Sequence, residues 1–347
     1  MRDKTIEDRR ISRRMLLGAL PAWAAARRAL GQAGGAPLAA RKLIQMTLVV
    51  SDLQRSLEFY QGLFGMALQG RQGSTVLLRV GKGPQFLALR PAEGNAKPGY
   101  SHFGLGVNGF DADRALQVLT GHGVRASEER GPMTARIRRR GPEEGGAREG
   151  TPELFLDDPN GIAVQLQDTS YCGGAGALGN VCRAMAGAAP KGRLAVSDLS
   201  HLTMFVSDAE RAQRFYQEVF GLFLQAHQGP AAPLYGVGAG PQFLMFAGGG
   251  GRAAAASGIN HGCVAMEGFN PDAVLRALTD YGLKPRGEAA GPAGPLQHYV
   301  TLRMENRGGS PDGTPELYFT DPDGILVQIQ DVRYCGGAGK LGEVCRG

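Results

Sequence analysis

The sequence predicts an α+β protein built from two tandem copies of one domain. Three observations point to this fold: a long internal repeat, a strand–helix–strands order that recurs within each copy, and enough apolar residues to form a core. The 347 residues suit two domains of ordinary size, and hydrophobic residues make up 43% of them, which excludes a wholly disordered chain.

Matching motifs recur along the chain at a nearly constant spacing. Phe59 and Tyr60 return as Phe215 and Tyr216, 156 residues later. A Gly-Thr-Pro-Glu-Leu motif at 150–154 returns 163 residues later, so the spacing drifts by only seven residues, which loops absorb at small cost. We therefore predict copy 1 at residues 40–182, a linker rich in Ala, Gly and Pro at 183–198, and copy 2 at residues 199–347.

The first half of copy 1 is expected to contain a strand, a helix and two further strands. The apolar and β-branched run at 43–50 is typical of a strand. Asp52, or the serine before it, can cap the helix that follows, whose apolar residues recur on one face, and Gly65 can end it. Further strands are expected at 75–80 and 85–89.

The second half of copy 1 repeats this order. A strand, a helix and three more strands are expected at 101–107, 111–120, 133–138, 153–156 and 162–167. Each copy is therefore predicted to consist of two related units, and the internal repeat extends this organisation to copy 2.

Four motifs in each copy together resemble one known superfamily. They are Val-Ser-Asp at the end of the first strand, Phe-Tyr and Phe-Gly on the helix, a histidine that opens the second half, and Asp-Pro-Asn/Asp-Gly before the last strand. This combination resembles the vicinal oxygen chelate (VOC) superfamily, which includes glyoxalase I, extradiol dioxygenases, epimerases and the fosfomycin and bleomycin resistance proteins. The resemblance implies βαβββ units whose curved mixed sheets enclose a concave, metal-containing site.

In copy 2 the resemblance implies three metal ligands, His201, His261 and Gln328. The third ligand in the superfamily is normally Glu, and an amide oxygen is a neutral and weaker donor than a carboxylate. The metal affinity is then lower, or a different metal or an anion of the substrate completes the site, or Glu316 or Glu305 supplies the missing negative charge. We expect a divalent metal ion, with Fe²⁺ favoured because two imidazoles and a carboxylate suit non-haem iron, and Mn²⁺, Zn²⁺ or Ni²⁺ as alternatives.

The corresponding positions of copy 1 are Gln45, His102 and Gln165, so we expect its site to be degenerate. His298 lies in a predicted strand of copy 2, where copy 1 has Ala135. It is the candidate acid–base group or a residue that supports a ligand, and a solvated strand histidine is the alternative.

Two pairs of cysteines occupy the same frame in the two copies. Cys172 and Cys182 in copy 1 correspond to Cys335 and Cys345 in copy 2. In an oxidising compartment such pairs can form disulfides, and free thiols or metal ligands are the alternatives. Cys263 lies in an apolar strand and is expected to be a buried, unpaired residue.

Residues 1–33 carry five of the six net positive charges, so the rest of the chain is nearly neutral. This removes the main support for nucleic-acid or anionic-membrane binding. Arg13 and Arg14 precede an apolar stretch at 15–26 and resemble a Tat export signal, which predicts a periplasmic or extracellular protein. A basic helix that stays attached is the alternative, and 12 apolar residues are too few for a membrane span, which needs ~20.

Two functional hypotheses follow. In the first, the protein is a metal-dependent enzyme, dioxygenase- or glyoxalase-like, that acts on a small oxygen-bearing substrate in copy 2, with copy 1 as a scaffold. In the second, the concave sheets bind a small molecule without chemistry, as bleomycin resistance proteins do. The superfamily supports many reactions on one fold, so the sequence leaves the substrate open, and an oligomer is compatible with both hypotheses.

Overall fold

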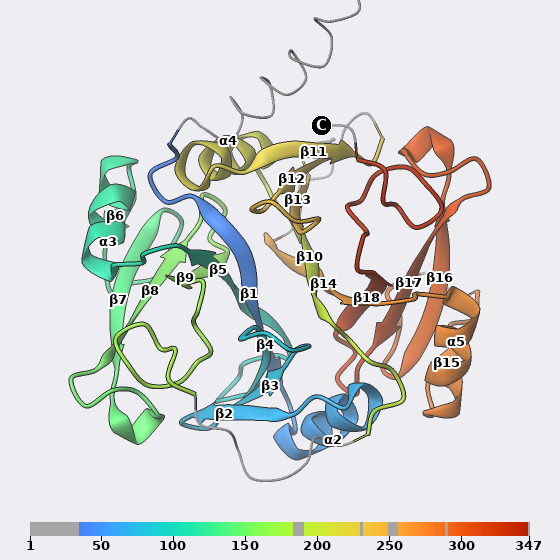
Figure 1. Ribbon diagram of the computed structural model, residues 1–347, viewed down its shortest axis with the longest axis horizontal. Helices are drawn as coiled ribbons and strands as arrows, with labels where there is room; N and C mark the ends of the chain where they lie inside the picture. Colours follow the sequence, from blue (N-terminus) through green and yellow to red (C-terminus); the bar gives the residue numbers. More distant parts are fainter. Residues whose placement is uncertain (1–34, 183–190, 230–231, 249–255, 289–290, 346–347) are drawn as a thin grey trace, which may run out of the picture.

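The computed structural model describes residues 35–182, 191–229, 232–248, 256–288 and 291–345. The described strands form two nine-stranded sheets, one in each copy, which lie side by side (Figure 1). This confirms the predicted α+β fold with two repeated domains. The predicted export signal at 1–33 and half of the predicted linker, residues 183–190, lie outside the described residues.

Copy 1 follows the predicted order of elements. Its elements are β1 (Ala40–Val50), α2 (Leu53–Phe64), β2 (Leu68–Gln72), β3 (Thr75–Arg79), β4 (Phe86–Pro91), β5 (Gly99–Val107), α3 (Ala112–Gly121), β6 (Arg125–Ala126), β7 (Thr134–Arg140), the short 3₁₀ helix η1 (Pro142–Glu144), β8 (Thr151–Asp157) and β9 (Ala163–Asp168). The sequence analysis did not find β2 and β6, because these short edge strands carry no clear alternation of apolar residues.

Copy 2 repeats the same order. Its elements are β10 (Asp198–Phe205), α4 (Ala209–Phe220), β11 (Phe223–His227), β12 (Pro233–Gly236), β13 (Phe243–Ala247), β14 (Gly258–Met266), α5 (Pro271–Asp280), β15 (Lys284–Pro285), β16 (Gln297–Arg303), η2 (Glu305–Arg307), β17 (Thr314–Thr320) and β18 (Leu326–Asp331). Both long first helices begin at an aspartate cap, Asp52 or Asp208, and end at a glycine with positive φ, Gly65 or Gly221, as their sequences require.

The order of strands places three of them together at the middle of each sheet. The order in copy 1 is β2-β3-β4-β1-β5-β9-β8-β7-β6, and copy 2 has the equivalent order β11-β12-β13-β10-β14-β18-β17-β16-β15. The central strands β1, β5 and β9, or β10, β14 and β18, are the ones on which the sequence analysis placed the candidate ligands. Strands far apart in the sequence thus bring these residues to one place.

The first helix of each copy packs on a strand of its own sheet and also contacts the other copy. Tyr60 on α2 of copy 1 donates a hydrogen bond to Asp321 of copy 2 over 3.1 Å. Tyr216 on α4 of copy 2 donates in the same way to Asp158 of copy 1 over 3.2 Å. In Figure 1, α4 lies at the top of the molecule near β11, and α2 lies at the bottom near β2.

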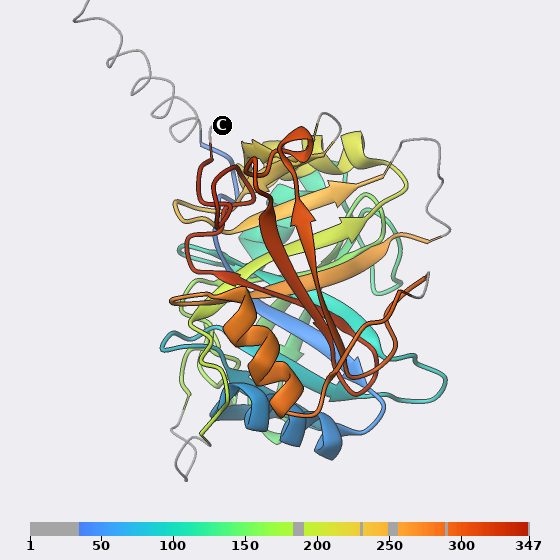
Figure 2. The ribbon, with the colours of Figure 1, turned by 90° about the vertical axis from the view of Figure 1, so that its right-hand side faces the viewer.

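Aromatic packing joins α2 to the core of copy 2. Phe59 and Phe64 of α2 lie 6.2 Å and 5.8 Å from Phe319 of β17, measured between ring centroids. Tyr281, which follows α5, donates a 3.0 Å hydrogen bond to the carbonyl of Phe59, and Figure 2 shows α5 lying next to α2. The main cluster of buried apolar residues consequently runs through both copies without interruption.

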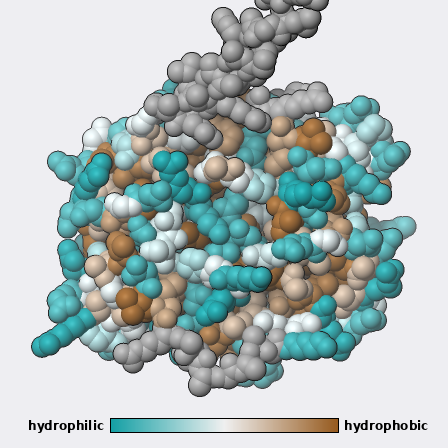
Figure 3. Space-filling view, viewed as in Figure 1, coloured by the Kyte–Doolittle hydropathy of each residue, from teal (hydrophilic) through white to brown (hydrophobic). Residues whose placement is uncertain are grey.

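The hydropathy of the surface is similar over the two copies. On the face shown in Figure 3, hydrophilic residues alternate with smaller hydrophobic areas over both copies. Within the described residues, no helix is long and apolar enough to cross a membrane.

Candidate functional site

The three candidate ligands of copy 2 converge on one point. His201 on β10, His261 on β14 and Gln328 on β18 are all buried on the concave side of sheet 2. The Nε2 atoms of His201 and His261 lie 2.9 Å and 3.0 Å from the same atom, Oε1 of Gln328.

The donor atoms of this group fit a bound cation. Donor atoms that lie 2.9 Å and 3.0 Å apart are close enough to bind one cation together. Nδ1 of His261 lies 2.8 Å from Oδ1 of Asn260, so Nδ1 carries the proton and Nε2 keeps its lone pair. That lone pair faces a lone pair of the Gln328 carbonyl oxygen, which is unfavourable unless a positive charge lies between them. The amide nitrogen of Gln328 is buried and has no hydrogen-bond partner among the described residues.

The surroundings of the two histidines fix their orientation and keep them neutral. The ring of His201 stacks on Phe243, with centroids 4.3 Å apart and planes inclined by 8°, and Tyr334 lies 5.5 Å away. Burial lowers the pKa of His261 to about 4, and burial together with the neighbouring His261 lowers the pKa of His201 well below its ordinary value. Both imidazoles are therefore neutral at pH 7, the form that binds metals.

No carboxylate completes this group. Glu316 accepts hydrogen bonds from Nε of Arg303 over 2.7 Å and from the hydroxyl of Tyr334 over 2.9 Å, so its charge is already balanced. Glu305 is exposed in η2. Accordingly, the described part of the chain contains no group of three His, Cys, Asp or Glu side chains that could hold a metal, and the third donor is the amide of Gln328.

The structure does not bring His298 to the histidine pair. Its Nε2 lies 2.9 Å from the hydroxyl of Thr279 on α5. His298 pairs with Phe319 in the sheet and shares its face, whereas the next residue, Tyr299, pairs with Tyr318, which borders His261. Alternation along the strand thus turns His298 to the side of the sheet covered by the helix.

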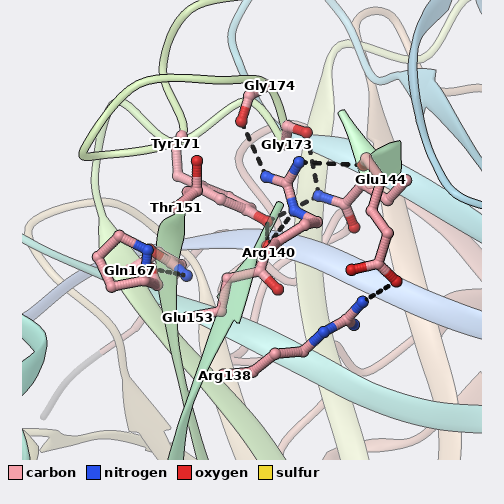
Figure 4. Close-up of polar contacts among 12 residues, drawn as sticks. Arg138, Arg140, Glu144, Thr151, Glu153, Gln167, Tyr171, Gly173 and Gly174 are labelled. Atoms are coloured by element: carbon pink, nitrogen blue, oxygen red, sulfur yellow. Dashed lines mark hydrogen bonds and ion pairs between the residues drawn. The ribbon is translucent and has the colours of Figure 1, made fainter. Parts of the chain in front are cut away.

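Each site is supported by a buried polar network that was not predicted from the sequence. In copy 1, Arg140 donates to Glu153 over 2.7 Å and to the carbonyl of Gly174 over 2.8 Å, and Tyr171 donates to Glu153 over 2.8 Å (Figure 4). In copy 2 the same contacts join Arg303, Glu316, Gly337 and Tyr334. A signal was present, because the Arg, Glu, Gly and Tyr of copy 1 all recur 163 residues later.

The cysteine pairs close the loops that carry this network. Cys172 is bonded to Cys182 and Cys335 to Cys345, as the sequence analysis expected for an oxidising environment. Each disulfide follows directly after the tyrosine of the network, and Tyr334 borders the ring of His201. The disulfide loop of copy 2 therefore holds an aromatic side chain beside the histidine pair. Cys263 is buried and unpaired, also as expected.

Copy 1 has no histidine pair at the equivalent position. The amide of Gln45 donates a hydrogen bond to Oε1 of Gln165, and Nε2 of His102 lies 3.1 Å from the hydroxyl of Thr47. The two amides thus bond to each other, and a single imidazole remains.

Known proteins resemble both copies. The sequence model of the Glyoxalase/Bleomycin resistance protein/Dioxygenase superfamily matches residues 42–166 and 198–329. No curated protein matches the sequence.

Similar solved structures include a homoprotocatechuate 2,3-dioxygenase from Arthrobacter globiformis, with a TM-score of 0.56 and 17% identity over 85% of this chain and 82% of that one. A Mn(II)-bound glyoxalase from Novosphingobium aromaticivorans has a TM-score of 0.57 and 13% identity over 84% of this chain and 82% of that one. At such identities the likeness shows the fold.

Proposed function

Because the chain belongs to the Glyoxalase/Bleomycin resistance protein/Dioxygenase superfamily, we propose that copy 2 is a metal-dependent catalytic domain that acts on a small oxygen-bearing molecule. The convergence of His201, His261 and Gln328, with 2.9 Å and 3.0 Å between their donor atoms, is the observation that carries the proposal. The proposed reaction class is dioxygenase- or glyoxalase-like. The proposed ion is Fe²⁺, with Mn²⁺, Zn²⁺ or Ni²⁺ as alternatives, and a structural neighbour described as Mn(II)-bound is consistent with such a site.

A divalent ion bound here would supply Lewis-acid chemistry to the oxygen atoms of a substrate. The chain's own residues prepare the place for it. Phe243 fixes the ring of His201, and Asn260 fixes the tautomer of His261. Burial raises the pKa values of Tyr334 and Tyr318 well above the ordinary value, so both phenols stay protonated and act as hydrogen-bond donors.

Copy 1 would support this domain through the contacts of the first helices and the shared core. The proposal includes export through the segment that contains Arg13 and Arg14. A Tat-like route carries folded proteins, so the metal could be loaded before export.

Elemental analysis of protein purified without a metal-affinity tag tests the proposal. We expect about one divalent ion per chain in the native protein and less than about a tenth of that in His201→Ala, because one imidazole alone holds such ions weakly. His102→Ala is the matched control in copy 1 and should keep the metal. Circular dichroism shows whether each variant is folded. Native protein that takes up none of the four metals, or equal losses in both variants, would contradict the proposal.

The neutral amide of Gln328 favours a second candidate, a protein that binds a small molecule without catalysis. It supplies no negative charge to a divalent ion, unlike the carboxylate of a facial triad. Metal-free protein that still binds small molecules would support this candidate.

A further inference from the structure

A cavity of about 160 Å³ opens on the concave side of sheet 1. Its wall includes Gln45 and Gln165, the counterparts of two candidate ligands in copy 2. The remaining polar lining is unusually rich in positive charge. Four arginines contribute to it, namely Arg90 on β4, Arg130 in the loop before β7, and Arg136 and Arg138 on β7.

Two of these arginines are not neutralised. Arg130 forms a 2.7 Å ion pair with Asp157, and Arg138 pairs with Glu144 (Figure 4). Within the described parts of the chain, Arg90 and Arg136 have no carboxylate at ion-pair distance.

One carboxylate, Glu153, also lines the cavity, but it is bonded to the buried guanidinium of Arg140. Arg130, Arg138 and the buried Arg140 each pair with one carboxylate, which leaves Arg90 and Arg136 as two unpaired positive charges at the cavity. The cavity therefore carries an excess of about two positive charges.

The inner wall offers neutral polar groups beside this charge. Thr47 and the buried amides of Gln45 and Gln165 face the cavity, and Oε1 of Gln45 has no hydrogen-bond partner among the described residues. Burial, and then the charges of nearby arginines, lower the pKa of His102 to about 3, so its ring is neutral.

Apolar rings complete the wall and orient one of the free cations. The guanidinium of Arg136 lies 5.4 Å from the centre of the Phe155 ring, and Phe86 borders the same cavity. A cation held over an aromatic face is restricted in orientation before any ligand binds.

Copy 2 lacks all four arginines. In register with the repeat, Ala247 replaces Arg90, Ala293 replaces Arg130, Tyr299 replaces Arg136 and Thr301 replaces Arg138. The buried Arg140, in contrast, has its counterpart in Arg303. The scaffold therefore does not require the four arginines, and a separate role has to explain them.

We propose that the concave side of copy 1 is a second binding site, separate from the histidine pair, for a small organic dianion such as a dicarboxylate or a phosphate monoester. Arg90 and Arg136 bind the anionic oxygens, and Thr47 donates a hydrogen bond. Phe86 and Phe155 contact the carbon skeleton. The proposal does not depend on a metal in copy 2.

Titration calorimetry at low ionic strength tests this site with two probes, phthalate and phenyl phosphate, and with the neutral phthalamide as the control ligand. We expect at least one dianion to bind and phthalamide not to bind. Binding of phthalate alone assigns the site to carboxylates, and binding of phenyl phosphate alone assigns it to phosphate esters. Failure of both dianions overturns the proposal.

Variants of the full-length protein locate the binding. Arg90→Gln and Arg136→Gln should each weaken it about tenfold or more, as expected when one charge-assisted hydrogen bond is lost. Arg276→Gln removes an exposed arginine outside the cavity and should leave the affinity unchanged.

His201→Ala should also bind the dianion normally, whatever its metal content, which separates this proposal from the one for copy 2. Equal weakening in Arg136→Gln and Arg276→Gln, or loss of binding in His201→Ala alone, would overturn the assignment to copy 1.

Discussion

The two copies share one scaffold, but their concave sites have opposite electrostatic character. In copy 2, the lone pairs of the His261 imidazole and the Gln328 amide oxygen face each other, and Nε2 of the neutral His201 lies 2.9 Å from the same oxygen. In copy 1, four arginines surround the equivalent space, and the amides of Gln45 and Gln165 bond to each other. A site that offers lone pairs suits a cation, and a site that offers guanidinium groups suits an anion.

The comparison separates what the fold needs from what each site does. The Arg–Glu–Tyr network, the disulfide loop and the tyrosine hydrogen bond from the first helix to the other copy occur in both copies with nearly the same distances. The differences lie in side chains that line the concave faces and contribute little to the shared core. Variants in both copies can therefore distinguish structural residues from functional ones.

The largest effect is expected at the buried ion pairs. Arg140→Met and Arg303→Met should each lower the free energy of unfolding by about 3–5 kcal/mol, because each leaves a buried glutamate without its partner. Denaturant unfolding measures this. The exposed pair of Arg214 and Glu210 is the control, and Arg214→Met should cost less than about 1 kcal/mol. A large loss in only one copy would show that the network is not a shared structural element.

The second effect concerns Asp158 and Asp321, the carboxylates that accept hydrogen bonds from the tyrosines of the other copy. Burial raises the pKa values of Asp158 and Asp321 to about 6, above the ordinary value of 3.8. The folded state therefore binds more protons than the unfolded state between these values, so the contribution of each group is fully present below pH 3.8 and is lost as the pH rises through 6. A pKa difference of about two units between the folded and unfolded states corresponds to about 3 kcal/mol in the free energy of unfolding for each group.

Asp158→Asn and Asp321→Asn test this pH dependence. The stability of the wild type relative to either variant should fall as the pH increases from 4 to 7. The slope of this difference, measured by denaturant unfolding at each pH, is the informative quantity, since the substitution also changes the hydrogen bond from Tyr216 or Tyr60. A difference that does not vary with pH would mean that the carboxylate does not titrate in this range.

The smallest effect is a change in metal affinity, expected when the same substitution, Gln to Glu, is made in each site. Gln328→Glu supplies the missing carboxylate to the histidine pair and should raise metal affinity at least about tenfold, or about 1.4 kcal/mol. Gln165→Glu should not create a metal site, because copy 1 has only His102. Equilibrium dialysis measures both. Equal metal uptake by the two variants would contradict the assignment of the cation site to copy 2.

Much of the fold could be predicted because its signals are local or repeated. The spacing of 156–163 residues established the duplication, and Asp52 and Gly65 fixed the ends of the first helix. The contacts of α2 and α4 with the other copy left no such signal, since an apolar helix face does not specify what it packs against. The contacts of Phe59, Phe64 and Tyr60 with copy 2, and of Tyr216 with copy 1, appear only in the structure.

The site shows a similar division. Superfamily resemblance identified His201, His261 and Gln328, and the structure brings these three residues together. The resemblance did not identify the side of the sheet on which His298 lies, because a shift of one residue along a strand reverses the face. The arginines of copy 1 also gave no signal, since a loop and two strands have to meet before their charges surround one cavity.

The sequence by itself determined the duplication, the order of the elements, the cysteine pairs and the strands that carry the candidate ligands, because each depends on short segments and their spacing. Only the tertiary structure decided which residues of the other copy each first helix contacts, which face each histidine occupies, and that the two concave sites differ in charge. These properties depend on packing between distant segments, and no local pattern in the chain records the sum of the charges that meet there.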